Sequence, residues 1–148
     1  MGWVIQRHGA IYWDEFGWDN SFEALVARIV ADFHAESRPD RERAWIAQID
    51  GARAGCVFCC EHDPETAQLR ILLVEPWARG RKLGSRLVDE CINFARAAGY
   101  PTMTLWTNDV LVSARRIYEA AGFVLVDEAR HRGFGNELVG QNWELDLT

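Results

Sequence analysis

The stretch "LLVEPWARGRKLGSRLVDE", Leu72 to Glu90, joins an apolar run to a helical pattern through a short turn. The nearly continuous apolar run is typical of a strand that is buried on both faces. Four positive charges fall in or just after the turn, at Arg79, Arg81, Lys82 and Arg86. A helix start offers unpaired N–H groups and a partial positive charge, which such cations reinforce. From the turn alone, an anion site and a solvated turn whose arginines only aid solubility both stay open.

Two glycines in the turn, Gly80 and Gly84, would let the backbone approach a phosphate closely. The spacing differs from that of a P-loop, because only three residues separate the glycines and no Lys-Ser/Thr pair follows Gly84. It also differs from the G-x-G-x-x-G fingerprint of dinucleotide-binding proteins. These differences disfavour a nucleoside triphosphate or a dinucleotide as the ligand.

The composition predicts one domain over residues 1–148, with 49% hydrophobic residues and a net charge of -6. An acidic chain lacks the basic footprint of nucleic-acid-binding proteins. No apolar run approaches the ~18 residues of a membrane-spanning helix, and the N-terminus does not resemble a signal peptide. We therefore expect a cytoplasmic protein whose partners include neither nucleic acid nor a membrane.

The segment "CVFCCEH" (56–62) superficially resembles a metal-binding knuckle, since it contains C-x-x-C followed by His62. Its flanks predict a strand, which would point Cys56 and Cys59 to opposite faces. No second pair of ligands follows at the spacing of a zinc site. We expect no metal, and predict that Cys56, Cys59, Cys60 and Cys91 are buried, reduced thiols.

The remaining patterns predict alternating elements. Residues 2–12 favour an opening strand with a turn, and residues 21–35 favour a helix with Ser21 as its N-cap. Asp50-Gly51 is typical of a hairpin, and two later helices end at Gly99 and Gly122. The expected order, β-α-β-β-β-α-β-α-β-β, is an α/β class with a mixed, mostly antiparallel sheet flanked by helices. The closing strand "NWELDL" (142–147) could pair across a dimer or form a guarded edge.

Two motifs resemble those of a known family. "RGRKLGSRL" (79–87) resembles the R/Q-x-x-G-x-G/A signature of the GNAT superfamily of N-acetyltransferases, and it follows that family's L-x-V-x-P strand ending. "LVSARRIYEAAGF" (111–123) is similar to the family's A-x-x-x-Y-x-x-x-G-F helix. The expected element order matches the family fold over essentially the whole chain. The chain resembles in particular the acetyltransferase halves that follow helix-turn-helix regulators in some bacterial proteins.

This resemblance implies that the turn binds the pyrophosphate of acetyl-CoA. Lys82 stands where the signature has its first glycine, so a non-glycine residue must present its N–H group there. In the family, a backbone N–H near Leu73–Val74, where that strand splays from its neighbour, stabilises the thioester oxygen. The resemblance assigns cofactor binding to Leu73, Val74, Arg79, Gly80, Arg81, Lys82, Leu83, Gly84 and Ser85. Asn108, at a strand end, is either a further cofactor contact or a plain turn residue.

For the chemistry, the resemblance assigns Tyr118 as the proton donor to the departing thiolate, although spacing alone favours a packing role. Family members carry a glutamate as base at positions that correspond here to Gln68 and Trp106, neither of which can take a proton. Glu75, at the end of the apolar strand, is our candidate for the base. Glu61, Asp14 and Glu15 are alternatives that could equally be surface carboxylates.

Acceptor specificity in the family depends on loops that here are "YWDEFGWD" (12–19) and "RHRGFGNELVGQ" (130–141). Aromatic walls with carboxylates would suit a cationic or aromatic amine, while simple anchoring explains the same residues. The resemblance implies direct acetyl transfer from acetyl-CoA to a primary amine of a small molecule or peptide. The alternative is a non-catalytic module that senses acetyl-CoA or binds a partner. A homodimer fits either function.

Overall fold

The computed structural model describes residues 1–36 and 38–148. Within these residues the chain forms four α-helices, one short 3-10 helix and six strands. They are, in chain order, α1 (Gly2–Phe16), α2 (Asn20–Glu36), β1 (Arg43–Ile49), β2 (Ala52–Asp63), β3 (Thr66–Val74), η1 (Pro76–Ala78), α3 (Leu83–Ala97), β4 (Thr102–Asn108), α4 (Val112–Ala121), β5 (Val124–Gly133) and β6 (Asn136–Asp146).

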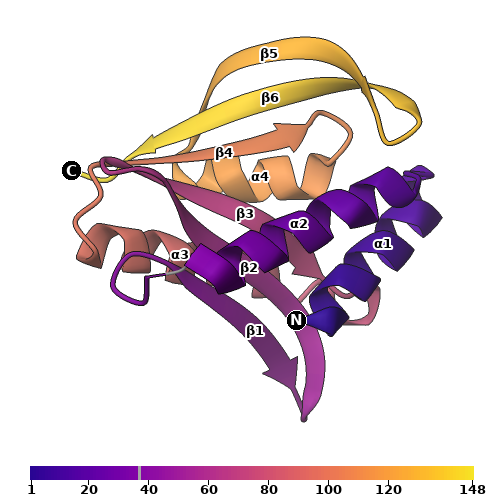
Figure 1. Cartoon of the computed structure of the whole chain (residues 1–148), viewed down its shortest axis with the longest axis horizontal. Coiled ribbons are helices and arrows are strands. Elements are labelled where there is room, and N and C mark those ends of the chain that lie inside the picture. The colour runs from indigo at the N-terminus through magenta and orange to yellow at the C-terminus, as the bar shows by residue number, and fades with distance from the viewer. Residues whose placement is uncertain (37) are drawn as a thin grey trace.

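The strands form one mixed sheet in the order β1-β2-β3-β4-β6-β5 (Figure 1). Neighbouring strands are antiparallel except for the parallel pair β3 and β4. The predicted hairpin at Asp50-Gly51 joins β1 to β2, and both residues have the positive φ that a tight hairpin turn requires. The predicted mixed, mostly antiparallel sheet with flanking helices is therefore confirmed.

The first element is a helix, so the strand predicted for residues 2–12 is wrong. Val4, His8 and Ile11 are buried on one side of α1 at helical spacing. Gly9 lets α2 come close, since a Cβ atom there would lie 2.9 Å from the carboxyl carbon of Glu23. The chain thus begins with two helices, and the rest of the predicted order holds.

Two smaller predictions also need correction. Helix α2 begins at Asn20, and its cap is Asp19 rather than Ser21, because Asp19 Oδ1 accepts the backbone N–H of Ser21 at 3.0 Å. The closing strand β6 lies between β4 and β5, so it is neither a sheet edge nor free to pair across a dimer. The β5–β6 hairpin folds back, so β5 forms one edge of the sheet and β1 forms the other.

The sheet separates two apolar cores (Figure 1). Helices α1 and α2 cover one face, where Cys56, Phe58 and Cys60 of β2 are buried. Helices α3 and α4 cover the other face, where Val57 and Cys59 are buried. Cys56 and Cys59 therefore point to opposite faces, as predicted.

All four cysteines are free and buried. Burial raises the pKa of the Cys56 and Cys60 thiols to about 12, which keeps both protonated near neutral pH. The described residues contain no group of three or more side chains suited to hold a metal ion.

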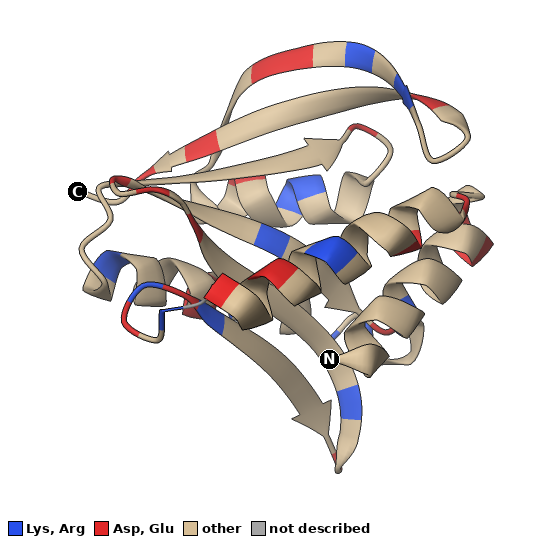
Figure 2. Ribbon diagram, in the orientation of Figure 1, with Lys and Arg blue, Asp and Glu red and all other residues tan. Residues whose placement is uncertain are grey.

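Acidic and basic residues are interspersed along the elements (Figure 2). On β5, for example, Asp127 and Glu128 precede Arg130 and Arg132. The net charge of -6 is thus distributed over several elements. None of the helices in the described part of the chain is both long and apolar enough to span a bilayer.

Candidate active site

The parallel strands β3 and β4 pair over only three residue pairs, from Thr66–Thr102 to Gln68–Thr104. Beyond Gln68, β3 continues to Val74 with β2 alone as its partner. Because a strand directs its N–H and C=O groups alternately to its two sides, the end of β3 turns backbone groups toward the gap. Unpaired backbone groups need a partner, which a ligand lying along β3 can supply.

An irregularity in β3 lies beside this gap. The register between β2 and β3 shifts by one residue between Cys56 and Phe58, opposite Ile71 and Leu72. Ile71 has a φ of 47°, which is rare for a β-branched residue. A bulge bends a strand and redirects its side chains, and strain of this kind is often found at functional sites.

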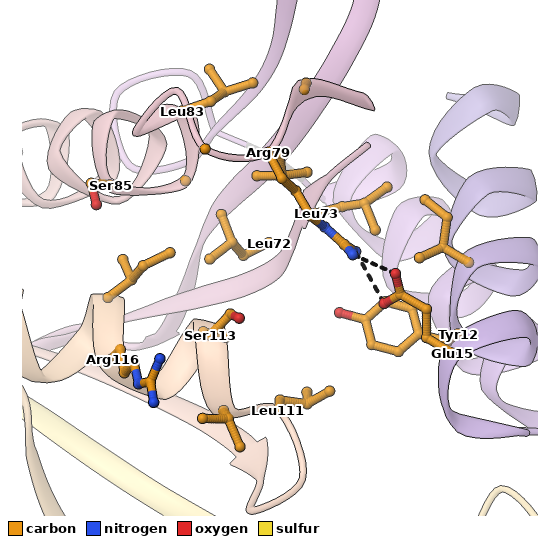
Figure 3. A pocket seen from close by; sticks show the side chains of 18 of the residues that line it. Tyr12, Glu15, Leu72, Leu73, Arg79, Leu83, Ser85, Leu111, Ser113 and Arg116 are labelled. Carbon is orange, nitrogen blue, oxygen red and sulfur yellow. Dashed lines mark hydrogen bonds and ion pairs between the residues drawn. The ribbon is translucent and has the colours of Figure 1, made fainter. Parts of the chain in front are cut away.

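A cleft of about 480 Å³ occupies the gap, within the range of small-molecule pockets. Figure 3 shows side chains that line it from the end of β3, the turn before α3, the first turns of α4 and the last turns of α1. The cleft therefore lies where both strands end and where two helices begin.

The N-terminus of α3 opens into this cleft. Lys82 is its N-cap residue and makes no side-chain capping bond. The N–H of Arg86 is the one that bonds to the Lys82 carbonyl, so the amides of Leu83, Gly84 and Ser85 have no acceptor inside the helix. All three residues line the cleft. Free amides and the positive end of the helix dipole together make an anion site.

Lys82 stands where the family signature has its first glycine. Lys82 takes the left-handed conformation, with φ 59° and ψ 21°, that a glycine would adopt easily. Packing explains the glycine at position 84, since a Cβ atom there would lie 2.7 Å from Ile117 Cδ1 on α4. The glycine thus allows α3 and α4 to approach closely beside the cleft.

The four cations of the opening stretch separate in space. Arg79 and Lys82 line the cleft. Arg81 and Arg86 instead line a separate open depression beside β1. Arg116 on α4 adds a cation to the cleft (Figure 3), and sequence reasoning missed it because its position depends on how α4 packs.

Arg79 reaches across the cleft mouth to Glu15 on α1 (Figure 3). The two side chains form a two-pronged ion pair, with Arg79 Nη2 3.0 Å from Glu15 Oε2. Hydrogen bonding to Glu15 raises the pKa of the Arg79 guanidinium. The pair is exposed, and such pairs contribute little to stability, so an anionic ligand can compete with Glu15 for Arg79.

Tyr118 is buried on α4 and packs edge-on against Phe123, with ring centroids 5.9 Å apart. Burial raises the pKa of its phenol well above the usual range, so the hydroxyl keeps its proton at every working pH. Tyr118 does not line the first cleft. It lines a second cavity, which is bordered by residues of both β3 and β4.

The candidate base Glu75 is engaged elsewhere. Its buried carboxylate accepts hydrogen bonds from Arg7 Nε at 2.9 and 2.8 Å, and Arg7 Nη2 lies 2.7 Å from Oε1. Glu75 lines neither the cleft nor the second cavity. The pair joins α1 to the end of β3, which favours a structural role for Glu75.

None of the alternative carboxylates lies in the cleft or the second cavity as an unpaired base. Glu61 pairs with Arg38 and Arg41, and Glu15 pairs with Arg79. Asp14 lines neither cavity. Gln68 and Trp106, at the two positions where the family carries its base, both line the second cavity.

The second cavity has a volume of about 130 Å³. It shares four lining residues with the first cleft, so the two adjoin: Tyr12, Leu72, Leu111 and Ala114. Its far wall is a cluster of aromatic rings contributed by α1, α2, the loop between them and the β5–β6 hairpin: Tyr12, Trp18, Phe22 and Phe134. Of the aromatic residues in the segment 12–19, Tyr12 and Trp18 line this cavity, whereas Trp13 is exposed and Phe16 lines the first cleft.

The predicted carboxylates are missing from that wall: among the described residues, no Asp or Glu lines the second cavity. Asp19 caps α2 and Glu15 faces the first cleft. Asn108 also faces the second cavity rather than the first, and its Oδ1 lies 2.8 Å from His131 Nε2. The structure therefore places Asn108 away from the cleft predicted to hold the cofactor.

His8 on α1 is a residue that sequence reasoning missed, since it lay in the predicted strand. Its Nδ1 lies 2.7 Å from the carbonyl oxygen of Val4, one helical turn earlier, and this contact requires Nδ1 to carry the proton. Nε2 is buried and has no hydrogen-bond partner among the described residues. Burial lowers the pKa of His8 to about 4, which the carbonyls of Val4 and Ile71 oppose only in part.

The shifted pKa predicts acid sensitivity. His8 is neutral in the folded state down to about pH 4, whereas in the unfolded chain it gains a proton below about pH 6.5. Its contribution to stability is therefore complete above pH 6.5 and is lost as the pH falls toward 4. Between pH 7 and 4.5, the free energy of unfolding should fall by about 2 kcal/mol more in the wild type than in His8→Leu.

Urea unfolding at the two pH values measures this difference. His34→Leu is the matched control, because His34 is exposed on α2 and should behave as the wild type does. Equal acid sensitivity of the wild type and His8→Leu would contradict the assignment.

Comparison with known proteins agrees with this geometry. Residues 6–123 match the Acetyltransferase (GNAT) family. An N-acetyltransferase of Schizosaccharomyces pombe is 30% identical over 126 residues, which are 84% of this chain and 77% of that protein. N-acetylaspartate synthetase of Mus musculus is 29% identical over 112 residues, or 75% of this chain. The match spans only 36% of that synthetase.

Solved structures share the fold. A ribosomal-protein-alanine N-acetyltransferase of Brucella melitensis superposes with a TM-score of 0.77 at 14% identity, covering 97% of this chain and 91% of that one. An acetyltransferase of Salmonella typhimurium, solved with acetyl-CoA, gives a TM-score of 0.71 at 19% identity, covering 83% of this chain and 74% of that one. The predicted fold, enzyme class and superfamily are thus confirmed, and this chain belongs to the GNAT family of acetyltransferases.

Proposed function

We propose that this chain, acting as a single domain over residues 1–148, transfers an acetyl group from acetyl-CoA to a primary amine of a small molecule or peptide. The observation that carries the proposal is one cleft that contains both the cationic N-terminus of α3 and the unpaired side of β3. The helix N-terminus and its cations suit a pyrophosphate. The amide groups of a pantetheine arm can form hydrogen bonds with the unpaired side of β3, as an added strand would.

Within that cleft, each group has a proposed place. The pyrophosphate accepts hydrogen bonds from the backbone N–H groups of Leu83, Gly84 and Ser85. Gly80, which has no side chain, leaves room for it. The side chains of Arg79, Lys82 and Arg116 add positive charge. Leu73 and Val74 present the backbone that pairs with the pantetheine arm and binds the thioester oxygen. We propose no direct contact for Arg81, whose side chain lies beside β1.

The reaction forms one bond and breaks another. The amine nitrogen attacks the carbonyl carbon of the thioester, the C–S bond breaks, and the proton that the nitrogen loses balances the one that the CoA sulfur gains. An alkylammonium of pKa about 10.4 must first lose a proton, at a cost of about 4.6 kcal/mol at pH 7, whereas an α-amine near 7.8 costs only about 1 kcal/mol. Weakly basic acceptors thus need no strong base.

Tyr118 is the proposed donor to the departing sulfur. It lies one helical turn from Ala114, which lines both cavities, and its raised pKa keeps the hydroxyl protonated. A hydrogen bond from such a phenol stabilises the thiolate while charge develops on sulfur. Glu75 has a structural role in this scheme, because Arg7 neutralises it.

Replacing Tyr118 tests the function. Tyr118→Phe removes only the hydroxyl, so kcat for amine-dependent thiol release should fall about 10²-fold, with little change in the KM for acetyl-CoA. Tyr100→Phe is the matched control: its hydroxyl bonds to the Arg41 carbonyl at 3.0 Å and lines neither cavity. That variant should lose some stability and keep its activity.

The assay measures free thiol released from acetyl-CoA with polyamines, amino acids, aromatic amines and short peptides. If acetyl-CoA raises the melting temperature but no amine supports release, the chain is a sensing module and the transfer proposal fails. If acetyl-CoA does not bind, the assignment of the cleft fails as well.

Two adjacent cations test the assignment of the cofactor. Lys82→Asn removes a charge that lines the cleft, and asparagine tolerates the left-handed backbone. It should weaken acetyl-CoA binding several-fold at low salt, with a smaller effect as salt is added. Arg81→Asn removes the same charge one residue away, beside β1, and should change the affinity less than twofold. Titration calorimetry at two salt concentrations compares them, and equal losses would refute the assignment.

The assembly and the location are further parts of the proposal. The edge strand β5 exposes Val124, Leu125 and Val126, which supports a homodimer through this edge. Sedimentation equilibrium should then give twice the mass of one chain. A mass of one chain at high protein concentration would exclude the dimer.

The four free cysteines support a cytoplasmic location, where thiols stay reduced.

A further inference from the structure

The second cavity differs in chemistry from the cleft beside it. Its wall carries closely packed rings, with centroids 4.7 Å apart for Tyr12 and Phe22 and 4.8 Å apart for Trp18 and Phe134. Among the described residues that line it, Arg70 is the one permanently charged side chain. A cationic ligand would therefore lose its water without gaining a carboxylate, and it would be repelled by Arg70.

Two buried polar atoms in this lining have no hydrogen-bond partner in the described part of the chain. They are His8 Nε2 and Thr107 Oγ1. Leaving a buried polar group unsatisfied is costly, so a pair of them bordering one cavity indicates that a ligand supplies the missing bonds. Their character also limits the ligand, because His8 Nδ1 holds the proton and Nε2 can only accept.

The geometry points to an acceptor subsite, within the transferase function proposed above, for a weakly basic primary amine on an aromatic or apolar body. The body packs against Tyr12, Trp18, Phe22 and Phe134, and the neutral amine donates an N–H to His8 Nε2. Its lone pair then faces the adjoining cleft and the thioester. Attack forms the N–C bond and breaks the C–S bond, and the proton shed by nitrogen is matched by the one taken up by sulfur.

Basicity decides which amines can enter as the neutral form. At pH 7 about one α-amine in seven is neutral, against about one alkylamine in 2,500. His8 itself remains neutral there, since burial depresses its pKa. The other titratable side chains of the lining are Tyr12 and Tyr118, whose pKa values burial raises, and Arg70. The cavity thus has no negatively charged group that would offset the cost of desolvating an ammonium ion.

Four probes separate amine basicity from the body that carries the amine. Phenylalanylglycine has a weakly basic amine on an aromatic body, and phenylethylamine has the same ring with a strongly basic amine. Glycylglycine is weakly basic without an apolar body, and spermidine is strongly basic without one. We expect kcat/KM at pH 7 to be at least tenfold higher for phenylalanylglycine than for each of the others. Spermidine as the best substrate would overturn the inference and leave the transferase function standing.

The variant His8→Leu tests the hydrogen bond. It should raise the KM for phenylalanylglycine about tenfold and leave the calorimetric affinity for acetyl-CoA unchanged, while His34→Leu changes neither. If His8→Leu does not fold, Thr107→Val provides the same comparison at the second unpartnered atom, with a smaller rise expected. An unchanged KM in a folded variant would overturn the role of the cavity. Acetyl-CoA binding without transfer to any probe would overturn the proposed function itself.

Discussion

Beyond Gln68 the two parallel strands part, and the amides on the open side of β3 lose the partners that a continuous sheet would give them. This single break in the ladder explains why the site lies where it does. Helix α3 follows β3 through η1 and the cationic turn, and α4 begins shortly after β4 ends. The first residues of both helices line the cleft at the break. The close approach at Gly84 and Ile117 fixes the two helices against each other beside it. A fully paired sheet would leave neither a cleft nor free backbone groups.

The same break separates two electrostatic environments. On one side, Arg79, Lys82 and Arg116 border the cleft of a chain that is acidic overall. Glu75 is held by Arg7, which does not line the cleft, whereas Glu15 is paired with Arg79, so a phosphate competes with Glu15 for that arginine while Lys82 and Arg116 add their charge. On the other side, the aromatic cavity is apolar apart from a few polar groups. An anionic donor and a neutral acceptor can therefore meet at a common boundary, each in a suitable environment.

Local patterns were enough to predict β3, the turn and α3, because a buried apolar run, glycines and helical spacing act over a few residues. They also located Arg79, Lys82 and Tyr118, which the family motifs mark. The first helix was mistaken for a strand because its aromatic and β-branched residues favour both structures and the burial that decides between them is tertiary.

What the sequence could not supply were pairings between distant elements. Glu75 becomes unavailable only because α1 brings Arg7 to it, 68 residues away in sequence. Arg116 joins the cleft, and Arg81 leaves it, because of how α4 and β1 pack. His8 becomes significant only once its helix is buried against the sheet with one nitrogen already satisfied. A single chain contains no local signal for these arrangements.

Amide hydrogen exchange with and without acetyl-CoA tests most directly whether the break between β3 and β4 is the cofactor site. The account predicts slower exchange at residues 71–74 and 83–85 when acetyl-CoA is bound, with the edge strand β5 unchanged. Protection confined to the face beside β1, or no protection at residues 83–85 at saturating acetyl-CoA, would contradict it.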